Sequence, residues 1–430
     1  MGGLLLQDFL DRERDSILEA LGEWLRIPSI SADPTYTADV RTSAQWCAAR
    51  MRAVGLEHVE LIETDGHPSV YADWLHAAGA PTVVVYGHHD VQPIDPLEEW
   101  LSPPFEPTVR DGQLFARGAI DDKGQVLSHL EAVRGLLHEC GHLPVNLKFL
   151  VEGEEEDGSR NFETLLEHER DRLACDVVVV SDTGMLAADV PSMCTGMRGL
   201  AAFDVVIRTA EADLHSGSFG GAVPNAAHVA ARLVAALHDP SRRVTIPGFY
   251  DNVRELTEAE RLSFAAVPFD DEDFEHVAGV RRLEGEAGAT TLERIWSRPT
   301  AEVTGMTSGY GGAGVKTIVP ATAALKVTFR LVADQDPLDI ATAFEQWVLG
   351  SVGEGVDVTV TRLGSVAAAL TPVYHPAVGA AARAIERVWG RSPLYTREGG
   401  SGPEEALARI LGRPVIYLGV GLPDDRIHAP

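Results

Sequence analysis

The stretch TVVVYGHHD, residues 82–90, decides the fold, because it joins a buried strand directly to three polar residues. Residues Thr82–Tyr86 are β-branched or aromatic, as expected of a strand buried on both faces of a parallel sheet. Similar strand patterns recur at Val145–Val151 and Asp176–Ser181, and helical patterns lie between them at Gly124–Glu139 and Asn161–Arg172. This alternation predicts an α/β fold with a mainly parallel sheet, in which ligands bind at the carboxyl ends of the strands.

The pattern changes at about Arg198, where residues begin to alternate between apolar and polar. The segments LAAFDVVIRT, ALKVTFRLV and VDVTVTRL, together with helical patterns such as Asn225–Leu237, predict a smaller α+β sandwich. The α/β pattern returns with a helix at Ala377–Trp389 and a strand at Val415–Leu418. We therefore expect a first domain formed by residues 1–196 and 372–430, interrupted by an inserted domain at 197–371. The acidic stretch Leu256–Arg298 is expected to be irregular.

Composition narrows the class of protein. The 430 residues include 36 basic and 64 acidic side chains, a formal charge of −28, which disfavours nucleic acids and anionic membranes as partners. Four widely spaced cysteines without a CxxC pair are expected to be buried thiols. No stretch reaches the roughly 18 apolar residues of a membrane span, and the N-terminal pattern is an amphipathic helix rather than a signal sequence. These features predict a soluble, cytoplasmic protein.

The first chemically informative pair is His88 and Asp90, which end the predicted strand. Residues two apart on an extended chain face the same way, whereas His89 between them faces the opposite way. A metal-bound imidazole usually donates its other ring N–H to a carboxylate or carbonyl, and Asp90 is placed to accept it. A capped strand end would give the same pattern, so this pair alone leaves both interpretations open.

Acidic residues follow the other predicted strands. Asp121 and Asp122 precede a helix, where one of them, Asp122, could be only the N-cap, and Asp182 follows the strand at 176–181. The run VEGEEEDGS contains Glu152, Glu154, Glu155, Glu156 and Asp157, which a solvated turn would also explain. Because all these loops follow strands of one predicted sheet, we expect them to converge on a metal site with oxygen and nitrogen ligands.

The order of the motifs resembles that of the M20 metallopeptidases over nearly the whole chain. The matching segments are GHHDVQP, RGAIDDKGQ, EGEEEDGS, SDT, DLHSGSFGG, GVKTIVP, TFRLV, REGGSGP and IHAP. GHHDVQP and DDKG are most similar to the branch that contains the cytosolic non-specific dipeptidase and carnosinase. No single motif is specific for this family, but nine motifs in the same order are a specific resemblance.

This resemblance implies a pair of divalent metal ions, zinc or manganese, in each subunit. The implied ligands are His88, Asp121, Glu156, Asp182 and His428. Asp121 would be shared by both ions and Asp90 would orient His88. Glu155 would be the general base, taking a proton from a water between the ions as it attacks the peptide carbonyl.

The resemblance also implies how the substrate is held. The inserted domain would be a lid and dimerisation domain, and His215 would stabilise the oxyanion from across the interface of a homodimer. The substrate-contacting positions would be His215, Thr317, Arg330, Ser401 and His428. A guanidinium suits the free carboxylate of a small peptide, because it offers a bidentate and permanently charged fork.

Two features depart from the family. Gly402 stands where a bulkier apolar residue is usual, which is expected to reshape the pocket beside Ser401. The sequence ends two residues after His428, where relatives usually continue into a helix, and a truncated chain would hold His428 weakly.

We therefore expect hydrolysis of dipeptides. The alternatives are an N-acyl amino acid deacylase, a desuccinylase or a carboxypeptidase-like enzyme of the same fold, and, from another class, a catalytically silent metal-binding or peptide-binding protein. A GxSxG motif is absent from the sequence, which counts against a serine hydrolase. The sequence leaves open the preferred substrate and the native metal, because zinc, manganese and cobalt all suit such ligands.

Overall fold

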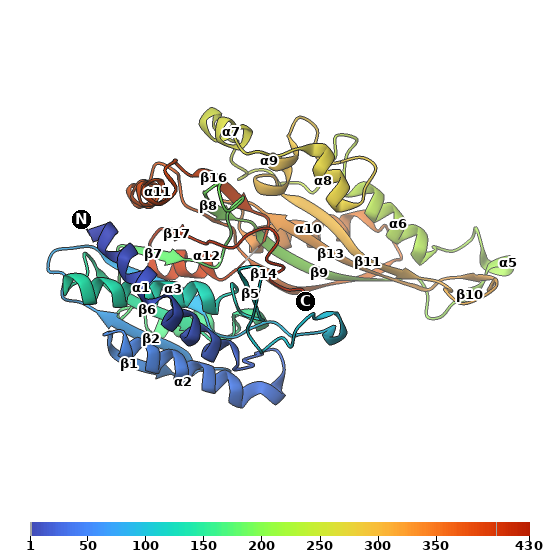
Figure 1. Cartoon of the computed structure of the whole chain (residues 1–430). Coiled ribbons are helices and arrows are strands. Elements are labelled where there is room, and N and C mark those ends of the chain that lie inside the picture. Colours follow the sequence, from blue (N-terminus) through green and yellow to red (C-terminus); the bar gives the residue numbers. More distant parts are fainter. Residues whose placement is uncertain (1, 401) are drawn as a thin grey trace. The chain divides into compact units, whose positions relative to one another are not determined.

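The chain folds into two structural units in the computed structural model, which describes residues 2–400 and 402–430 (Figure 1). The first unit contains the chain up to Thr195 together with Thr371–Tyr395 and Gly402–Pro430. The second contains Gly196–Leu370 and the short segment that begins at Thr396. The chain therefore leaves the first unit and returns to it.

A six-stranded sheet is the centre of the first unit. Its spatial order is β1 (Glu57–Ile62), β2 (Ser69–Trp74), β6 (Asn146–Glu152), β3 (Thr82–His88), β7 (Val177–Val180) and β17 (Val415–Tyr417). The neighbours β6, β3, β7 and β17 run parallel, and β2 is antiparallel to β6. The mainly parallel α/β sheet expected from the sequence is confirmed.

Helices cover both faces of this sheet, which explains why its central strands β3 and β7 are mostly apolar. Helices α1 (Gly2–Leu25), α2 (Thr37–Ala53) and α3 (Lys123–Cys140) form one core with alternate residues of the strands. On the opposite face, the ring of Tyr86 lies 5.2 Å from that of Phe162 in α4 (Phe162–His168). Helix α12 (Glu404–Leu411) contacts α4, and α11 (Pro376–Trp389) packs on β17.

Along the chain, shorter elements lie between those of the two units or at their boundary. They are the 3-10 turns Pro34–Tyr36, Leu97–Glu99 and Glu155–Asp157, and the strands β4 (Thr108–Arg110), β5 (Gln113–Phe115), β8 (Ser192–Met197), β15 (Ala369–Leu370) and β16 (Leu394–Glu398). All four cysteines are free thiols; three are buried and Cys140 is partly buried. Within residues 2–400 and 402–430, no helix is both long enough and apolar enough to span a bilayer.

An antiparallel sheet is the centre of the second unit. Its order is β11 (Thr300–Ser308), β13 (Thr322–Leu331), β9 (Gly199–Arg208) and β14 (Asp357–Val366). Helices α6 (Ala226–Ala236) and α10 (Pro337–Ser351) bury one face, with Phe203, Phe329 and Phe344 in mutual ring contact. A two-stranded ribbon, β10 (Leu214–His215) with β12 (Ile318–Val319), precedes β13, and α5 (Ser216–Phe219) follows β10.

The expectation that residues 256–298 are irregular was wrong. They contain α7 (Glu258–Ala265), α8 (Asp271–Ala278) and α9 (Thr291–Trp296). Thr257 with Glu260, and Thr290 with Glu293, form complete capping boxes that satisfy the first N–H groups of α7 and α9. The T-x-x-E spacing of these boxes is present in the sequence, but the high charge of the stretch favoured an irregular structure in the prediction.

Candidate metal centre

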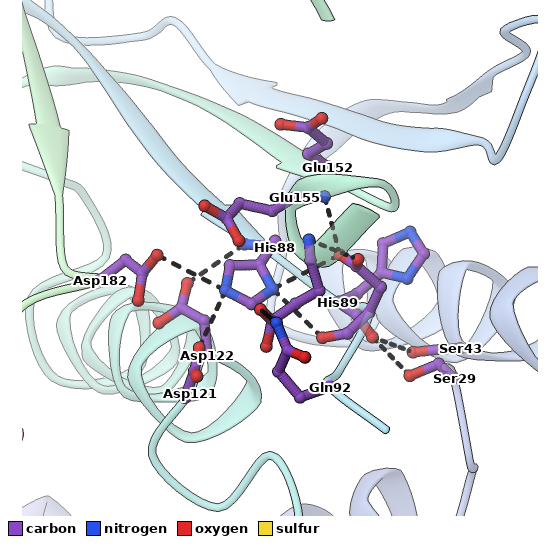
Figure 2. Close-up of polar contacts among 12 residues, drawn as sticks. Ser29, Ser43, His88, His89, Gln92, Asp121, Asp122, Glu152, Glu155 and Asp182 are labelled. Carbon is purple, nitrogen blue, oxygen red and sulfur yellow. Dashed lines mark hydrogen bonds and ion pairs between the residues drawn. The ribbon is translucent and has the colours of Figure 1, made fainter. Parts of the chain in front are cut away.

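The polar loops of the first unit meet at one edge of its sheet. His88 is the last residue of β3 and pairs in register with Glu152, the last residue of β6. The acidic turn that begins at Glu154 follows β6, and Asp182 follows β7. The expectation that Asp121 also follows a strand of this sheet was wrong, because the strand before it pairs in a separate two-stranded sheet and Asp121 lies just before α3. Figure 2 shows His88 among these side chains, with dashed contacts to Asp121 and Asp182.

Two groups of candidate ligands share Asp121. In the first group, His88 Nε2 lies 3.1 Å from Asp121 Oδ1 and 3.5 Å from Asp182 Oδ2. In the second, His428 Nε2 lies 3.2 Å from Asp121 Oδ2 and 3.5 Å from Glu156 Oε2. The ligand atoms within each group lie within 4.8 Å of one another. Asp121 thus presents a different oxygen to each group.

These separations fit divalent cations. Ligands about 2.1 Å from a tetrahedral ion lie about 3.4 Å from one another, and the contacts within the two groups are 3.1–3.5 Å. Glu156 Oε1 is buried and has no hydrogen-bond partner among the described residues. The mixture of imidazole and carboxylate also suits zinc or manganese. The residues present therefore fit a pair of metal ions.

The electrostatics of the centre favour a bound cation. Burial raises the pKa of Glu156 to about 7, and the charge of Asp121 adds to the rise. Burial also raises the pKa of Glu155 well above its usual value. Burial disfavours the charged form of Asp121, but hydrogen bonds from His428 and His88 outweigh it and lower its pKa. Because buried like charges repel, a cation among them would stabilise the ionised carboxylates.

Asp90 links His88 to the acidic turn. Its buried carboxylate accepts the backbone N–H groups of Glu155 at 3.3 Å and Glu156 at 3.0 Å. It also lies 3.4 Å from His88 Nδ1, whose nearer partner is the carbonyl oxygen of Asp90 at 3.1 Å. The sequence predicted the contact of Asp90 with His88 but not its hydrogen bonds with the acidic turn.

The structure separates the glutamates of the acidic run. Glu154 points away from the centre, with its Oε1 accepting from Asn161 Nδ2 at 3.0 Å. Glu152 accepts from the Tyr86 hydroxyl at 2.7 Å and points away from the His88 ring in Figure 2. Of the four glutamates, this leaves Glu155 and Glu156 for the centre, the pair that the family resemblance implied.

The neighbours of His88 in sequence have other partners. His89 faces away, with its Nε2 2.9 Å from the carbonyl oxygen of Pro68, and burial lowers its pKa to about 4. Asp122 occupies the N-cap position of α3, but its side chain makes no capping bond there. Its Oδ2 instead accepts the backbone N–H of His88 at 3.1 Å. Asp122 therefore supports the end of β3 rather than the helix.

Gln92 was missed as a site residue. Its Nε2 donates to Glu156 Oε2 at 2.6 Å, so it orients one of the candidate ligands. Gln92 stands in the GHHDVQP motif, but no local pattern in the sequence distinguishes it from an ordinary loop residue.

The predicted substrate residues of the second unit lie at separate ends of its sheet. His215 is exposed in β10, where its Nδ1 accepts the N–H of Gly217, and the carbonyl of Thr317 accepts the N–H of Ser216 at 2.9 Å. Arg330 lies near the opposite end of β13 from Thr322. Arg330 is eight positions after Thr322, which corresponds to about 26 Å along a strand.

Ser401 lies outside the described residues. The glycine after it has a clear steric setting, because a Cβ on Gly402 would lie 2.5 Å from Glu404 Oε2. Glu404 is buried, so its carboxylate fills the space that a bulkier residue would need.

A mainly parallel α/β sheet that carries two joined imidazole–carboxylate groups at its strand ends has the architecture of a metal-dependent hydrolase. The sequence profile of peptidase family M20/M25/M40 matches residues 84–430. The chain belongs to this family and is a metallopeptidase.

Three relatives illustrate the similarity. Human beta-Ala-His dipeptidase is 30% identical, over 98% of this chain and 87% of its own. A Cys-Gly metallodipeptidase of Schizosaccharomyces pombe is 29% identical, over 99% of this chain and 92% of its own. The crystal structure of an M20 family metallo-carboxypeptidase from Sulfolobus solfataricus has a TM-score of 0.83 and 34% identity, and the match covers 96% of this chain and 93% of that one.

Proposed function

We propose that this metallopeptidase hydrolyses dipeptides with two divalent metal ions, zinc or manganese. The proposed ligands are His88, Asp121, Glu156, Asp182 and His428. The observation that carries the proposal is Asp121, whose two carboxylate oxygens face the two histidines of separate ligand groups. Similarity to two kinds of dipeptidase supports the substrate class.

Ions bound there would supply Lewis acidity, which lowers the pKa of water and polarises the peptide carbonyl. Glu155 belongs to neither ligand group, yet its backbone is held beside Glu156 by Asp90. Its burial raises its pKa, so Glu155 is suited to accept a proton from water and to pass it to the leaving amine. Asp90 serves this chemistry by orienting His88 and the acidic turn.

The substrate would be held mainly by the second unit. Arg330 is proposed to bind the free C-terminal carboxylate, with Thr317, Ser401 and His428 as further contacts. Arg330→Ala should then reduce cleavage of a dipeptide far more than cleavage of its C-terminal amide, because the amide lacks the charge that the guanidinium pairs with. An equal loss on both substrates would assign Arg330 a structural role.

The length of the second unit supports a homodimer. His215 and Thr317 belong to the ribbon before Thr322. Thr322 lies about 26 Å from Arg330 along β13, whereas an extended dipeptide spans about 7 Å. One dipeptide therefore cannot touch both ends of the same subunit. We propose that His215 and Thr317 act in the site of a partner subunit, where His215 stabilises the oxyanion, and that Arg330 acts at the other end.

Mixing two inactive variants tests this arrangement. A dimer of one Glu155→Ala subunit and one His215→Ala subunit would contain one doubly defective site and one intact site. Random reassortment makes about half of the dimers mixed, so about a quarter of wild-type activity should return. A mixture no more active than the sum of its separate components would refute the exchange of His215 between subunits.

A substrate panel tests the reaction itself. The apoenzyme should be inactive, and zinc or manganese should restore cleavage of dipeptides such as beta-Ala-His and Cys-Gly. N-acyl amino acids and succinyl-diaminopimelate should react poorly. Carboxypeptidase activity is the second candidate because of the 34% identical metallo-carboxypeptidase, and release of the C-terminal residue from tetrapeptides would favour it. Metal binding without turnover of any substrate would favour a silent binding protein.

We also propose that the protein is cytoplasmic. Its four cysteines are free thiols, as is usual in a reducing compartment. Fractionation of the source cells followed by immunoblotting would locate the chain, and recovery outside the cytoplasm would refute the proposal.

A further inference from the structure

The two ligand groups differ in how their histidines are supported. His88 is fully buried in β3, and both its backbone and its ring have hydrogen-bond partners. The His428 side chain is 57% exposed and lies beyond β17, the last strand of the sheet. We refer to residues 422–430 as the His428 segment. A ligand on such a segment needs a separate anchor if it is to hold a metal ion in a fixed place.

Arg117 supplies a contact of this kind. It is 3% exposed, and its Nη1 donates to the carbonyl oxygen of Ile427, the residue directly before His428. Its Nη2 donates to the carbonyl oxygen of Pro93 at 3.2 Å, and its guanidinium lies over the Trp100 ring, 5.2 Å from the centroid. One planar group therefore joins the His428 segment to the loop after β3.

We propose that Arg117 is a positioning residue for His428, and that through this contact it sets the affinity of the second ligand group for its metal ion. Arg117 belongs to neither ligand group. The inference rests on the proposed pair of metal ions, and it predicts that Arg117 affects one ion and not the other. The first group has no ligand on the His428 segment and should be unaffected.

The charge of Arg117 could also affect metal affinity, but in the opposite direction. Arg117 interacts electrostatically with Glu156 and Asp121, two ligands of the second group. A fixed positive charge repels a metal ion, so its removal should strengthen metal binding if charge is all that Arg117 contributes. If Arg117 acts by holding Ile427, its removal should weaken binding at the second group.

Zinc titration of the apoenzyme by calorimetry separates these explanations. In Arg117→Gln, the first affinity should stay at the wild-type value and the second should fall about 10- to 100-fold, the usual effect of losing a residue that orients a ligand. Arg110→Gln is the matched control, because Arg110 also lies over an aromatic ring in the same unit but its side chain donates to Ser102 and, among the described residues, to no part of the His428 segment. An unchanged or stronger second affinity, or an equal fall at both, would overturn the proposal.

A double-mutant cycle tests the route through His428. If Arg117 acts only by positioning this histidine, Arg117→Gln should have no further effect on the second affinity in a His428→Ala background. Additive losses would show that Arg117 acts elsewhere.

Two further measurements keep the test decisive if Arg117→Gln fails to fold. Arg117→Lys keeps the charge but cannot bond Ile427 and Pro93 with the same planar fork, so an intermediate loss at the second group is expected. Hydrogen exchange of the metal-free Arg117→Lys variant should be faster than wild type in the His428 segment alone. Wild-type values in both measurements would refute the inference. Neither readout uses a peptide, so absence of dipeptidase activity would count only against the proposed function.

Discussion

His88 and His428 lie on either side of Asp121 but reach it from very different parts of the first unit. His88 ends a central strand, is fully buried, and is fixed by Asp90 and Asp122. His428 is more than half exposed, and Arg117 holds the residue before it. Ordering a loop costs conformational entropy that a residue already fixed in a sheet does not incur. The comparison therefore indicates that one metal site is built into the sheet and the other depends on longer-range contacts.

Removing the shared carboxylate of Asp121 should have the largest effect on activity, because it should weaken both metal sites and not only one. Asp121→Asn is expected to weaken both metal sites and to lower kcat/KM on the order of 10⁴-fold, because several kcal/mol of transition-state stabilisation depend on the metals. Metal content by mass spectrometry and turnover of a dipeptide provide the measurement. Asp157→Asn is the control, since Asp157 lies in the acidic turn and pairs with Arg160. Loss of only one metal in Asp121→Asn would show that the carboxylate is not shared.

The adjacent glutamates should separate chemistry from metal binding. Glu155→Gln is expected to keep both metals and to lower kcat by about 10²- to 10⁴-fold, because it removes the proton acceptor. Glu156→Gln should lose the second metal and keep the first. Equal metal contents in the two variants would mean that the roles of Glu155 and Glu156 are reversed.

The sequence predicted two of the residues of the candidate metal centre that lie at the ends of strands of the sheet. Runs of β-branched residues placed His88 and Asp182 at the same edge of the sheet, and the structure brings them together. The choice of Glu155 and Glu156 came from the family resemblance, because five acidic residues in one run look alike locally. Their roles and the ligand assignments remain predictions.

The remaining supports depend on contacts between distant parts of the chain. Arg117 and Ile427 are 310 residues apart, and Gln92 and Glu156 are 64 apart. Periodicity and spacing describe local structure, so they carry no information about which distant carbonyl or carboxylate a side chain will meet. The missed helices at 258–296 are a different case, because their capping boxes are local signals.

Asp90 should affect both sites, since it contacts His88 and also holds the acidic turn. Asp90→Asn is expected to weaken each metal site about 10- to 100-fold. The amide has only one acceptor oxygen, so it cannot replace both the contact with His88 and the bonds from the acidic turn. Calorimetric titration of the apoenzyme would give both affinities. Weakening of the first site alone would mean that the bonds from Asp90 to Glu155 and Glu156 are dispensable for metal binding.

Gln92 should give the smallest effect and the sharpest test of the asymmetry. Its amide donates to Glu156 Oε2, and among the described residues its side chain has no hydrogen bond to a member of the first ligand group. Gln92→Met keeps a similar side-chain volume but removes this donor, at a cost of about 1 kcal/mol, so the second site should weaken about 5-fold. The first affinity should not change, since His88 and Asp182, which belong to the first group alone, keep their supports. Competition with a chromophoric zinc chelator resolves a difference of this size. An equal change at both sites would show that the two groups are coupled through Asp121 and do not respond separately to their supports.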